Sequence, residues 1–346
     1  MILNQGNKKI WIDIINTPHV HFFHSLLSSF NKDNVFITSR QKLETLELLK
    51  QYGIENTVFG RDYKNKYLKL YGILARTIDL FFNLPKFDIS ISIQNGMSGL
   101  VSKARGNTCI LFDDNDYRGF INDISLKLSM KAQSLADYYI VPKPCYNNFL
   151  RFIKEDKLIS FDGYKEDISL SGFKPDPSHI ENIPFDEFIV IRPEALDALY
   201  VNAKSIVDDL IKNFRKENVN IVLLSRDKSS IDVMPEGVYI PKEAVNGLDL
   251  CYYSQAVLTG SGTMAREAAC MGIPAVSFFP GNSLLSVDKQ LVDDKKMYHS
   301  RDPNEIVEYV LSQQKEKKSL DLTRSIKVTN EVIMILKDII DLSSDI

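Results

Sequence analysis

The sequence has little cysteine and no long apolar run, and each shortage excludes a class of protein. Its 346 residues include four cysteines, at positions 109, 145, 251 and 270. No two of them form a C-x-x-C pair, so their spacing indicates neither a zinc site nor a disulfide framework. No stretch approaches the roughly 18 to 20 apolar residues of a membrane span, and the start, MILNQGNKKIWIDII, lacks the apolar core of a signal peptide. We therefore expect a soluble, cytoplasmic protein.

The chain also lacks an excess of charge of either sign. Lys and Arg number 42 against 45 Asp and Glu, a net charge of −3. This balance offers no electrostatic footprint for nucleic acid. Hydrophobic residues at 44% and charged residues at 25% are typical of a globular protein. The length favours two domains over one.

Short apolar runs alternate with longer helical patterns, in two series. The first has runs at 8–15, 34–39, 87–93, 107–112 and 137–142, and the second at 188–193, 219–225, 237–241, 255–260 and 274–280. Continuously apolar, β-branched runs suit parallel strands that are covered on both faces. Strand–helix alternation favours right-handed βαβ units. The pattern therefore predicts an α/β protein of two Rossmann-type, doubly wound parallel-sheet domains that face each other across a cleft.

A polar stretch with several prolines, near 172–187, separates the two series. We predict an N-terminal domain at 1–172, a C-terminal domain at 187–324, and a last helix at 325–346 that packs back on the first domain. Ligands of open α/β sheets bind beyond the carboxyl ends of the strands. The residues that follow each strand are therefore the candidates for a site.

The stretch LTGSGTMAREAACMGIPAV (258–276) joins a strand directly to a helix. Helix N-termini attract phosphate. Gly260 and Gly262 allow a close approach of the backbone, and Ser261 and Thr263 add hydroxyl donors. Glu267 lies about one turn beyond Thr263 on the same face, within reach of sugar hydroxyls. The alternative is a tight turn with a capping serine and a solvated glutamate.

The stretch NTPHVHFFHSLLSSF (16–30) follows the first strand. Thr17 suits an N-cap and Pro18 a first helical residue. His19 then lies in the first turn, off the buried stripe and facing the cleft mouth, where the helix dipole lowers its pKa and keeps it neutral for a general base. A surface cluster of histidines is the alternative. A metal site of His19, His21 and His24 lacks a single-face geometry.

Three further strand ends carry polar residues. LFDDNDYRGF (111–120) places Asp113, Asp114, Asn115 and Asp116 together, which favours acid–base work or binding of hydroxyls. A metal site or an exposed acidic loop remains open for the same residues.

The loop QNGMSG (94–99) offers Asn95 and Gly96 as substrate contacts, and Thr17 and Asn115 are two further candidates for such contacts. In IRPEALDALY (191–200), the guanidinium of Arg192 can clamp a diphosphate. Its alternative role is a salt bridge with Glu194.

These motifs resemble a family of uncharacterised, mostly archaeal proteins, grouped as a domain of unknown function within the GT-B superfamily. The segments that carry the resemblance are WIDIINTPHVHFFHSLL, LFDDND, VIRPEALDALYVNAKS, GLDLCYYSQAVLTGSGTMAREAACMGIPAVSFFPG and MYHSRDP. The spacing of Ser261, Gly262 and Glu267 resembles the diphosphate and ribose grip of UDP-N-acetylglucosamine 2-epimerases. PHVHFF and the triplet 113–115 resemble the N-acetylglucosaminyltransferase that forms lipid II.

The resemblance implies a glycosyltransferase with an N-terminal acceptor domain and a C-terminal nucleotide-sugar-binding domain. A UDP-sugar is its donor substrate, with no cofactor and no obligatory metal, and His19, Asp113 or Asp114 deprotonates an unidentified acceptor. The alternatives are a UDP-N-acetylglucosamine 2-epimerase-like enzyme and a non-catalytic nucleotide-sugar-binding protein.

The segment 63–87 combines apolar and basic residues at helical spacing. The apolar residues are Leu68, Tyr71, Leu74, Ile78, Phe81 and Phe82, and the basic ones are Lys64, Lys66, Lys69 and Arg76. Two interpretations remain open. The helix either packs its apolar residues on the sheet, or rests on the anionic inner face of a membrane that carries a lipid-linked acceptor.

Overall fold

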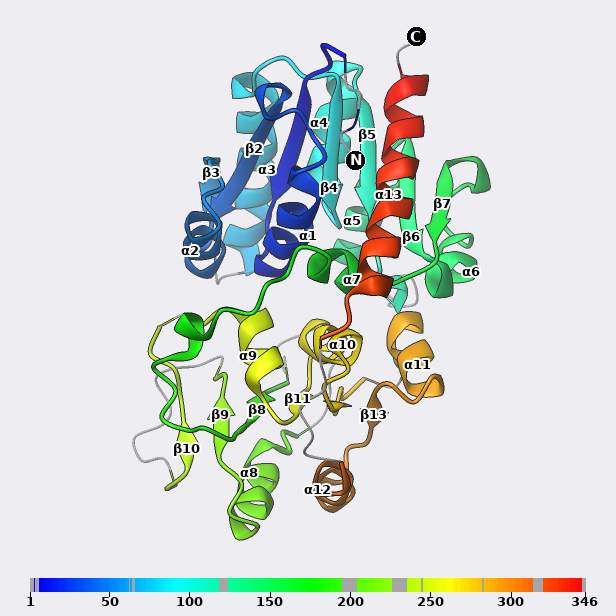
Figure 1. Ribbon diagram of the computed structural model, residues 1–346. Coiled ribbons are helices and arrows are strands. Elements are labelled where there is room, and N and C mark those ends of the chain that lie inside the picture. Colours follow the sequence, from blue (N-terminus) through cyan, green and yellow to red (C-terminus); the bar gives the residue numbers. More distant parts are fainter. Residues whose placement is uncertain are drawn as a thin grey trace. The chain divides into compact units, whose positions relative to one another are not determined.

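The computed structural model describes residues 3, 6–61, 63, 66–117, 124–194, 204–225, 235–243, 245–281, 283–313 and 320–343. The chain divides into two compact units. Unit 1 is Met1–Gly172 with Thr323–Ile346, and unit 2 is Phe173–Leu322. Each unit is built on a parallel sheet with helices packed against it (Figure 1).

The sheet of unit 1 has seven strands within the described residues, in the order β3-β2-β1-β4-β5-β6-β7, all parallel. They are β1 (Ile10–Ile14), β2 (Val35–Gln41), β3 (Thr57–Arg61), β4 (Ile89–Ile93), β5 (Thr108–Phe112), β6 (Tyr138–Pro142) and β7 (Leu158–Phe161). The strand order reverses between β1 and β4, which is where ligands bind in sheets of this type. The apolar runs of the sequence had not indicated β3 and β7.

Helices cover both faces of this sheet. One face carries α1 (Thr17–Leu27), α2 (Leu43–Gln51), α7 (Lys165–Leu170) and α13 (Thr323–Leu342), around an apolar core that includes Val332 and Leu336 of α13. The other carries α3 (Lys66–Asn83), α4 (Gly96–Arg105) and α5 (Ile124–Gln133), and the short α6 (Tyr146–Phe149) contacts β7. Helix α13, in red in Figure 1, packs against α7 and β7, so the last helix completes unit 1.

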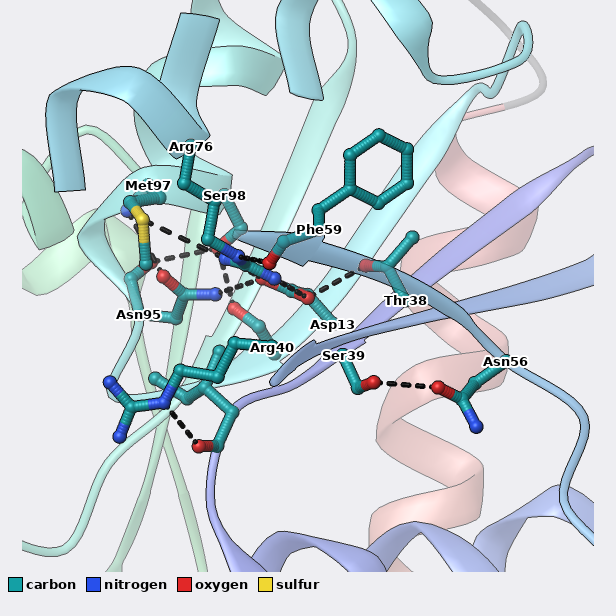
Figure 2. Close-up of polar contacts among 12 residues, drawn as sticks. Asp13, Thr38, Ser39, Arg40, Asn56, Phe59, Arg76, Asn95, Met97 and Ser98 are labelled. Carbon is teal, nitrogen blue, oxygen red and sulfur yellow. Dashed lines mark hydrogen bonds and ion pairs between the residues drawn. The ribbon is translucent and has the colours of Figure 1, made fainter. Parts of the chain in front are cut away.

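The layer between the sheet and α3 is polar at its centre. Asp13, which is fully buried in β1, accepts two hydrogen bonds from the guanidinium of Arg76 in α3, at 2.7 and 2.9 Å. Thr38 and Asn95 also donate to its carboxylate, at 2.7 and 2.6 Å. Figure 2 shows these side chains converging on Asp13. The network holds α3, β2 and the start of α4 to the central strand, and it leaves both carboxylate oxygens hydrogen-bonded.

The sheet of unit 2 has six parallel strands within the described residues, in the order β10-β9-β8-β11-β12-β13. They are β8 (Ile189–Arg192), β9 (Ile221–Leu223), β10 (Val238–Tyr239), β11 (Val257–Thr259), β12 (Ala275–Ser277) and β13 (Tyr298–His299). The helices are α8 (Val207–Lys216), α9 (Gly247–Tyr253), α10 (Gly262–Met271), α11 (Ser286–Asp293) and α12 (Pro303–Ser312). The order reverses between β8 and β11. The predicted pair of doubly wound parallel-sheet domains is confirmed.

Candidate functional site

In unit 2, the turn from β11 to α10 lies at the reversal of strand order. Ser261 is the N-cap residue of α10, but its side chain does not cap the helix, and the first turn has no acidic residue. Instead Thr259 organises the turn, because its hydroxyl accepts from the Ser261 amide at 2.9 Å and donates to the Ser261 carbonyl at 2.8 Å. The positive end of the α10 dipole is therefore not neutralised by a side chain of its own first turn.

The two glycines of this turn serve the protein's own packing, which differs from the role that we predicted. A Cβ at position 260 would lie 2.4 Å from Cγ of Glu194, and one at position 262 would lie 2.3 Å from Nη1 of Arg266. Gly260 thus lets β8 and β11 approach, and Gly262 makes room for the buried ion pair of Arg266 and Asp288, at 3.0 Å. Neither position is glycine solely for a ligand.

Arg192 ends β8 beside this turn, and its Cα pairs with that of Thr259. Within the described residues its guanidinium forms no hydrogen bond or ion pair, although it is only partly exposed. The alternative salt bridge with Glu194 is wrong, because the buried Glu194 carboxylate accepts from Ser205 at 2.8 Å and pairs with Arg301 at 3.4 Å. A half-buried cation without a protein partner is suited to an anionic ligand.

Glu267 is not a solvated residue of α10, since it is 6% exposed. It lies near Cys251 of α9, whose thiol donates to the carbonyl of Met264 in α10 at 3.8 Å. Burial raises the pKa of the Cys251 thiol well above its usual value; the charge of Glu267 acts in the same direction and that of Arg192 against it. The charges of Glu267 and Arg192 thus both act on the Cys251 thiol, with opposite effects on its pKa.

In unit 1, His19 lies in the first turn of α1, and it is buried, so the alternative of a surface cluster of histidines is wrong for it. The side chain is 4% exposed, and its Nδ1 atom has no hydrogen-bond partner among the described residues. Burial lowers the pKa of His19 to about 3. The positive charges of Lys165, Lys42 and Arg40 lower the pKa further, and the negative charge of Asp114 partly opposes them. The imidazole is neutral as predicted, but through burial and nearby cations.

The carboxylate of Asp114 binds two groups from other strand ends. Lys165, at the start of α7, donates to its Oδ2 at 2.8 Å, and Gln94, after β4, donates to its Oδ1 at 2.7 Å. Lys165 and Asp114 are 7% and 2% exposed. Gln94 has a φ of 52°, a left-handed conformation that costs a non-glycine residue about 1 kcal/mol or more. The ends of β4, β5 and β7 thus form one buried, charged cluster near His19.

The neighbouring carboxylates are also committed within the protein. Asp113 accepts from the hydroxyl of Tyr139 at 2.6 Å and from the amide of Asn115 at 2.9 Å. Asp116 accepts from Asn148 at 2.7 Å. Both are buried, so the acidic loop is not simply a solvated surface. In the part of the chain that the structure describes, no three His, Cys, Asp or Glu side chains are arranged to hold a metal ion.

Three of the predicted substrate contacts have structural roles. The Asn95 amide donates to Asp13 and accepts from the Met97 amide at 3.1 Å, which caps α4. Gly96 packs on α5, where an added Cβ would lie 2.8 Å from Cβ of Ala132. Thr17 is the first residue of α1, with Asn16 as the N-cap residue, and its hydroxyl contacts that of Thr45 at 3.3 Å.

The sequence-based candidates omitted Lys165, Gln94 and the pair of Arg266 and Asp288. Gln94 lies in the loop QNGMSG, in which the sequence predicts contacts for Asn95 and Gly96 alone. Lys165 follows β7, whose run LISF is four residues long and escaped notice. The signal that would have found it is the succession of a mostly apolar tetrad, a glycine and a lysine in LISFDGYK.

The fold is similar to that of a solved epimerase and a solved glycosyltransferase. The chain is 14% identical to UDP-GlcNAc 2-epimerase from Neisseria meningitidis, solved bound to UDP-GlcNAc, over 96% of this chain and 100% of that one, with a TM-score of 0.70. It is 11% identical to the glycosyltransferase of kitacinnamycin, over 97% and 99%, with a TM-score of 0.58. At these identities the likeness shows the fold, which is of the GT-B type.

Another protein is more similar to the chain in sequence. The chain is 30% identical over 319 residues to the uncharacterized protein MJ0665 of Methanocaldococcus jannaschii, covering 88% of this chain and 91% of the relative. Residues 8–339 also match the family model described as protein of unknown function, DUF354. The chain therefore belongs to the DUF354 family.

Proposed function

We propose that the protein is a glycosyltransferase whose donor substrate is a nucleotide-sugar with a uridine diphosphate group. The observation that carries the proposal is that Arg192, whose guanidinium has no protein partner among the described residues, ends β8 beside the N-terminus of α10, whose first turn has no acidic side chain. Both features favour a diphosphate. They occur at the reversal of strand order in unit 2, where nucleotides bind in sheets of this kind.

Glu267 has the role of the ribose contact in this proposal. It is buried close to the same turn, and a carboxylate that is kept from bulk water is a strong acceptor for a diol. The leaving diphosphate gains stabilisation from Arg192 and from the α10 dipole as negative charge develops on it. These groups supply that stabilisation without a metal ion, so metal independence remains part of the proposal.

In this proposal, unit 1 binds the acceptor and supplies the base that deprotonates it. The Nδ1 atom of the neutral His19 has no hydrogen-bond partner among the described residues and can accept the proton of an acceptor hydroxyl. A pKa of about 3 makes His19 a weak base in the free protein, and part of that depression comes from Lys165, Lys42 and Arg40. An anionic substrate group offsets those cations and raises the His19 pKa toward the range of a working base. Asp114 is held by Lys165 and acts as its counter-ion.

A second candidate function is a 2-epimerase, which needs carboxylates to move a proton on the sugar. Two observations favour it: the buried carboxylates of Asp113 and Asp114 lie together after β5, and the fold similarity to the Neisseria epimerase spans both chains. Against it, each carboxylate is already engaged, by Tyr139 and by Lys165. The imidazole of His19, whose Nδ1 atom has no hydrogen-bond partner among the described residues, suits a transferase better.

An assay with a panel of UDP- and GDP-sugars, with and without candidate acceptors, tests the proposal. Nucleotide release that requires an acceptor supports a transferase, and a new sugar isomer without acceptor supports an epimerase. Binding without turnover under every condition supports a non-catalytic protein. In a transferase, His19→Ala lowers turnover by about 10²- to 10⁴-fold while donor binding persists. His24→Ala, in the same helix but stacked on Tyr52 at 4.1 Å between ring centroids, is the matched control.

A further inference from the structure

Helix α3 exposes large apolar side chains along one side. Tyr71, Leu74, Ile78 and Phe82 are 63%, 58%, 59% and 73% exposed. Their spacing of three to four residues places them on one face of the helix. We call these four residues the α3 stripe. Single exposed apolar residues are common on protein surfaces, but a contiguous row of four is not.

The opposite face of α3 carries a buried charge. Arg76 is 4% exposed and donates from both terminal nitrogens to the buried Asp13, as Figure 2 shows. Its Nε atom donates to the carbonyl of Phe59 at 2.7 Å. Since successive helical residues are about 100° apart, the stripe lies roughly 160° to 240° around the axis from Arg76. The helix therefore turns a charge toward the sheet and apolar side chains toward the outside.

This orientation is fixed by the ion pair. Rotating α3 to bury the stripe would remove the guanidinium from Asp13 and leave a carboxylate unpaired at a position that is fully buried. The stripe is thus exposed by a specific contact rather than by loose packing. The expectation that this apolar surface packs on the sheet is wrong for these four residues. Leu80 and Leu84 fill the core beneath α3 instead.

The neighbouring helices add positive charge and more apolar surface. Helix α4 contacts α3, and α5 contacts α4, on the same face of the sheet. Leu128 of α5 is 61% exposed. Lys103 of α4 and Lys131 of α5 are exposed, and neither forms an ion pair within the described residues. On α3, Asp79 is only partly exposed and accepts from Asn83 at 2.6 Å.

We propose that this surface rests on an anionic lipid bilayer, with the α3 stripe in the interfacial region and Lys103 and Lys131 near lipid phosphates. Apolar and aromatic side chains bordered by lysines bind such interfaces. The contact is peripheral, because no helix in the described ranges has the length and hydropathy to cross a bilayer. A second copy of this chain on a two-fold axis would bring the unpaired lysines near one another, which disfavours it. The inference does not depend on the proposed function.

Co-sedimentation of the full chain with vesicles tests the proposal. We expect binding to phosphatidylcholine vesicles that contain phosphatidylserine, stronger at low salt, and little binding to phosphatidylcholine alone. Ile78→Ser with Phe82→Ser is expected to weaken binding by about tenfold or more. The matched control is Leu43→Ser, at a residue 69% exposed on α2, which packs on the other face of the sheet.

Charge reversal separates the electrostatic contribution. Lys103→Glu with Lys131→Glu is expected to abolish the salt-sensitive part of binding, whereas Lys50→Glu, on α2, leaves it unchanged. The fluorescence of the buried Trp11 reports whether each variant folds. Equal binding by the stripe variant and wild type overturns the proposal. The absence of binding at low salt also overturns the proposal. A third contrary result is light scattering that shows a dimer for the wild type and a monomer for the stripe variant.

Discussion

Replacing Arg76 with methionine is expected to destabilise unit 1 strongly. The substitution keeps most of the side-chain length but removes the charge that faces Asp13, which is 0% exposed. It also removes the donor to the Phe59 carbonyl. Removing one partner of a buried ion pair typically costs about 3 to 5 kcal/mol, because the remaining charge is left without compensation. Thr38 and Asn95 still donate to Asp13, so we expect the lower part of that range.

Tryptophan fluorescence during urea unfolding measures this cost directly. The chain has one tryptophan, Trp11, which is buried in β1 and donates to Thr38 at 2.8 Å. The signal therefore reports unit 1 alone, although a chain of two units need not unfold in a single transition. Lys86→Met, at an exposed position just after α3, is the surface control and is expected to change stability by less than about 0.5 kcal/mol.

A double substitution distinguishes the ion pair from simple packing. Asp13→Asn with Arg76→Met retains an acceptor for Thr38 and removes both charges. It is expected to cost less than the sum of the two single substitutions, because residues of one network are coupled by roughly 0.5 to 3 kcal/mol. A cost below about 1 kcal/mol for Arg76→Met alone, or strict additivity of the pair, would refute the view that this ion pair holds α3 in place.

Four other outcomes follow from the site. Glu267→Ala is expected to weaken UDP binding by about 1 to 3 kcal/mol in calorimetry; unchanged affinity would make it a structural residue of α10. Arg192→Met should weaken UDP by a similar amount but leave uridine binding nearly intact, and equal losses for both ligands would contradict a diphosphate contact. EDTA should leave turnover intact. Loss of turnover that Mg²⁺ or Mn²⁺ restores would contradict this and identify the carboxylates of residues 113–116 as metal ligands. The folded-state pKa of His19 is lowered from 6.5 to about 3, so unfolded chains bind the extra proton and stability is lost as pH falls between those values. His19→Asn should make that slope shallower in thermal unfolding, while His21, whose pKa burial also lowers to about 3, keeps its own contribution.

The strands that the sequence predicted lie in apolar runs, and those it missed do not. The four residues of β7 (LISF) and the two of β13 (YH) each include a polar residue, which interrupts the run. β3 (TVFGR) lies at the edge of its sheet, contains Gly60 with a φ of 72°, and exposes Val58, so it has no continuous apolar run. Each missed strand also hid the residues that follow it. Lys165 was overlooked because β7 was.

Local spacing located Asp113 and Asp114 at a strand end but did not predict what they bind. Lys165 is 51 residues after Asp114 and Gln94 is 20 before it. These groups meet because β4, β5, β6 and β7 are successive neighbours in the sheet, and strand order was not deduced from the sequence. Burial of His19 was missed for a related reason, since the first turn of a helix is exposed only when no other element covers it.

The orientation of α3 shows what an amphipathic pattern leaves undecided. Its spacing establishes that the helix has an apolar face, but not that the sheet takes that face. Asp13 decides the matter: a carboxylate inside the run IWIDI, in a strand covered on both sides, requires a cation from a neighbouring element. Arg76 is the arginine of α3, and it is the residue that supplies that cation. A buried acid in a central strand can therefore set the rotation of the helix that supplies its cation. The same rotation determines which side chains of that helix are exposed to solvent.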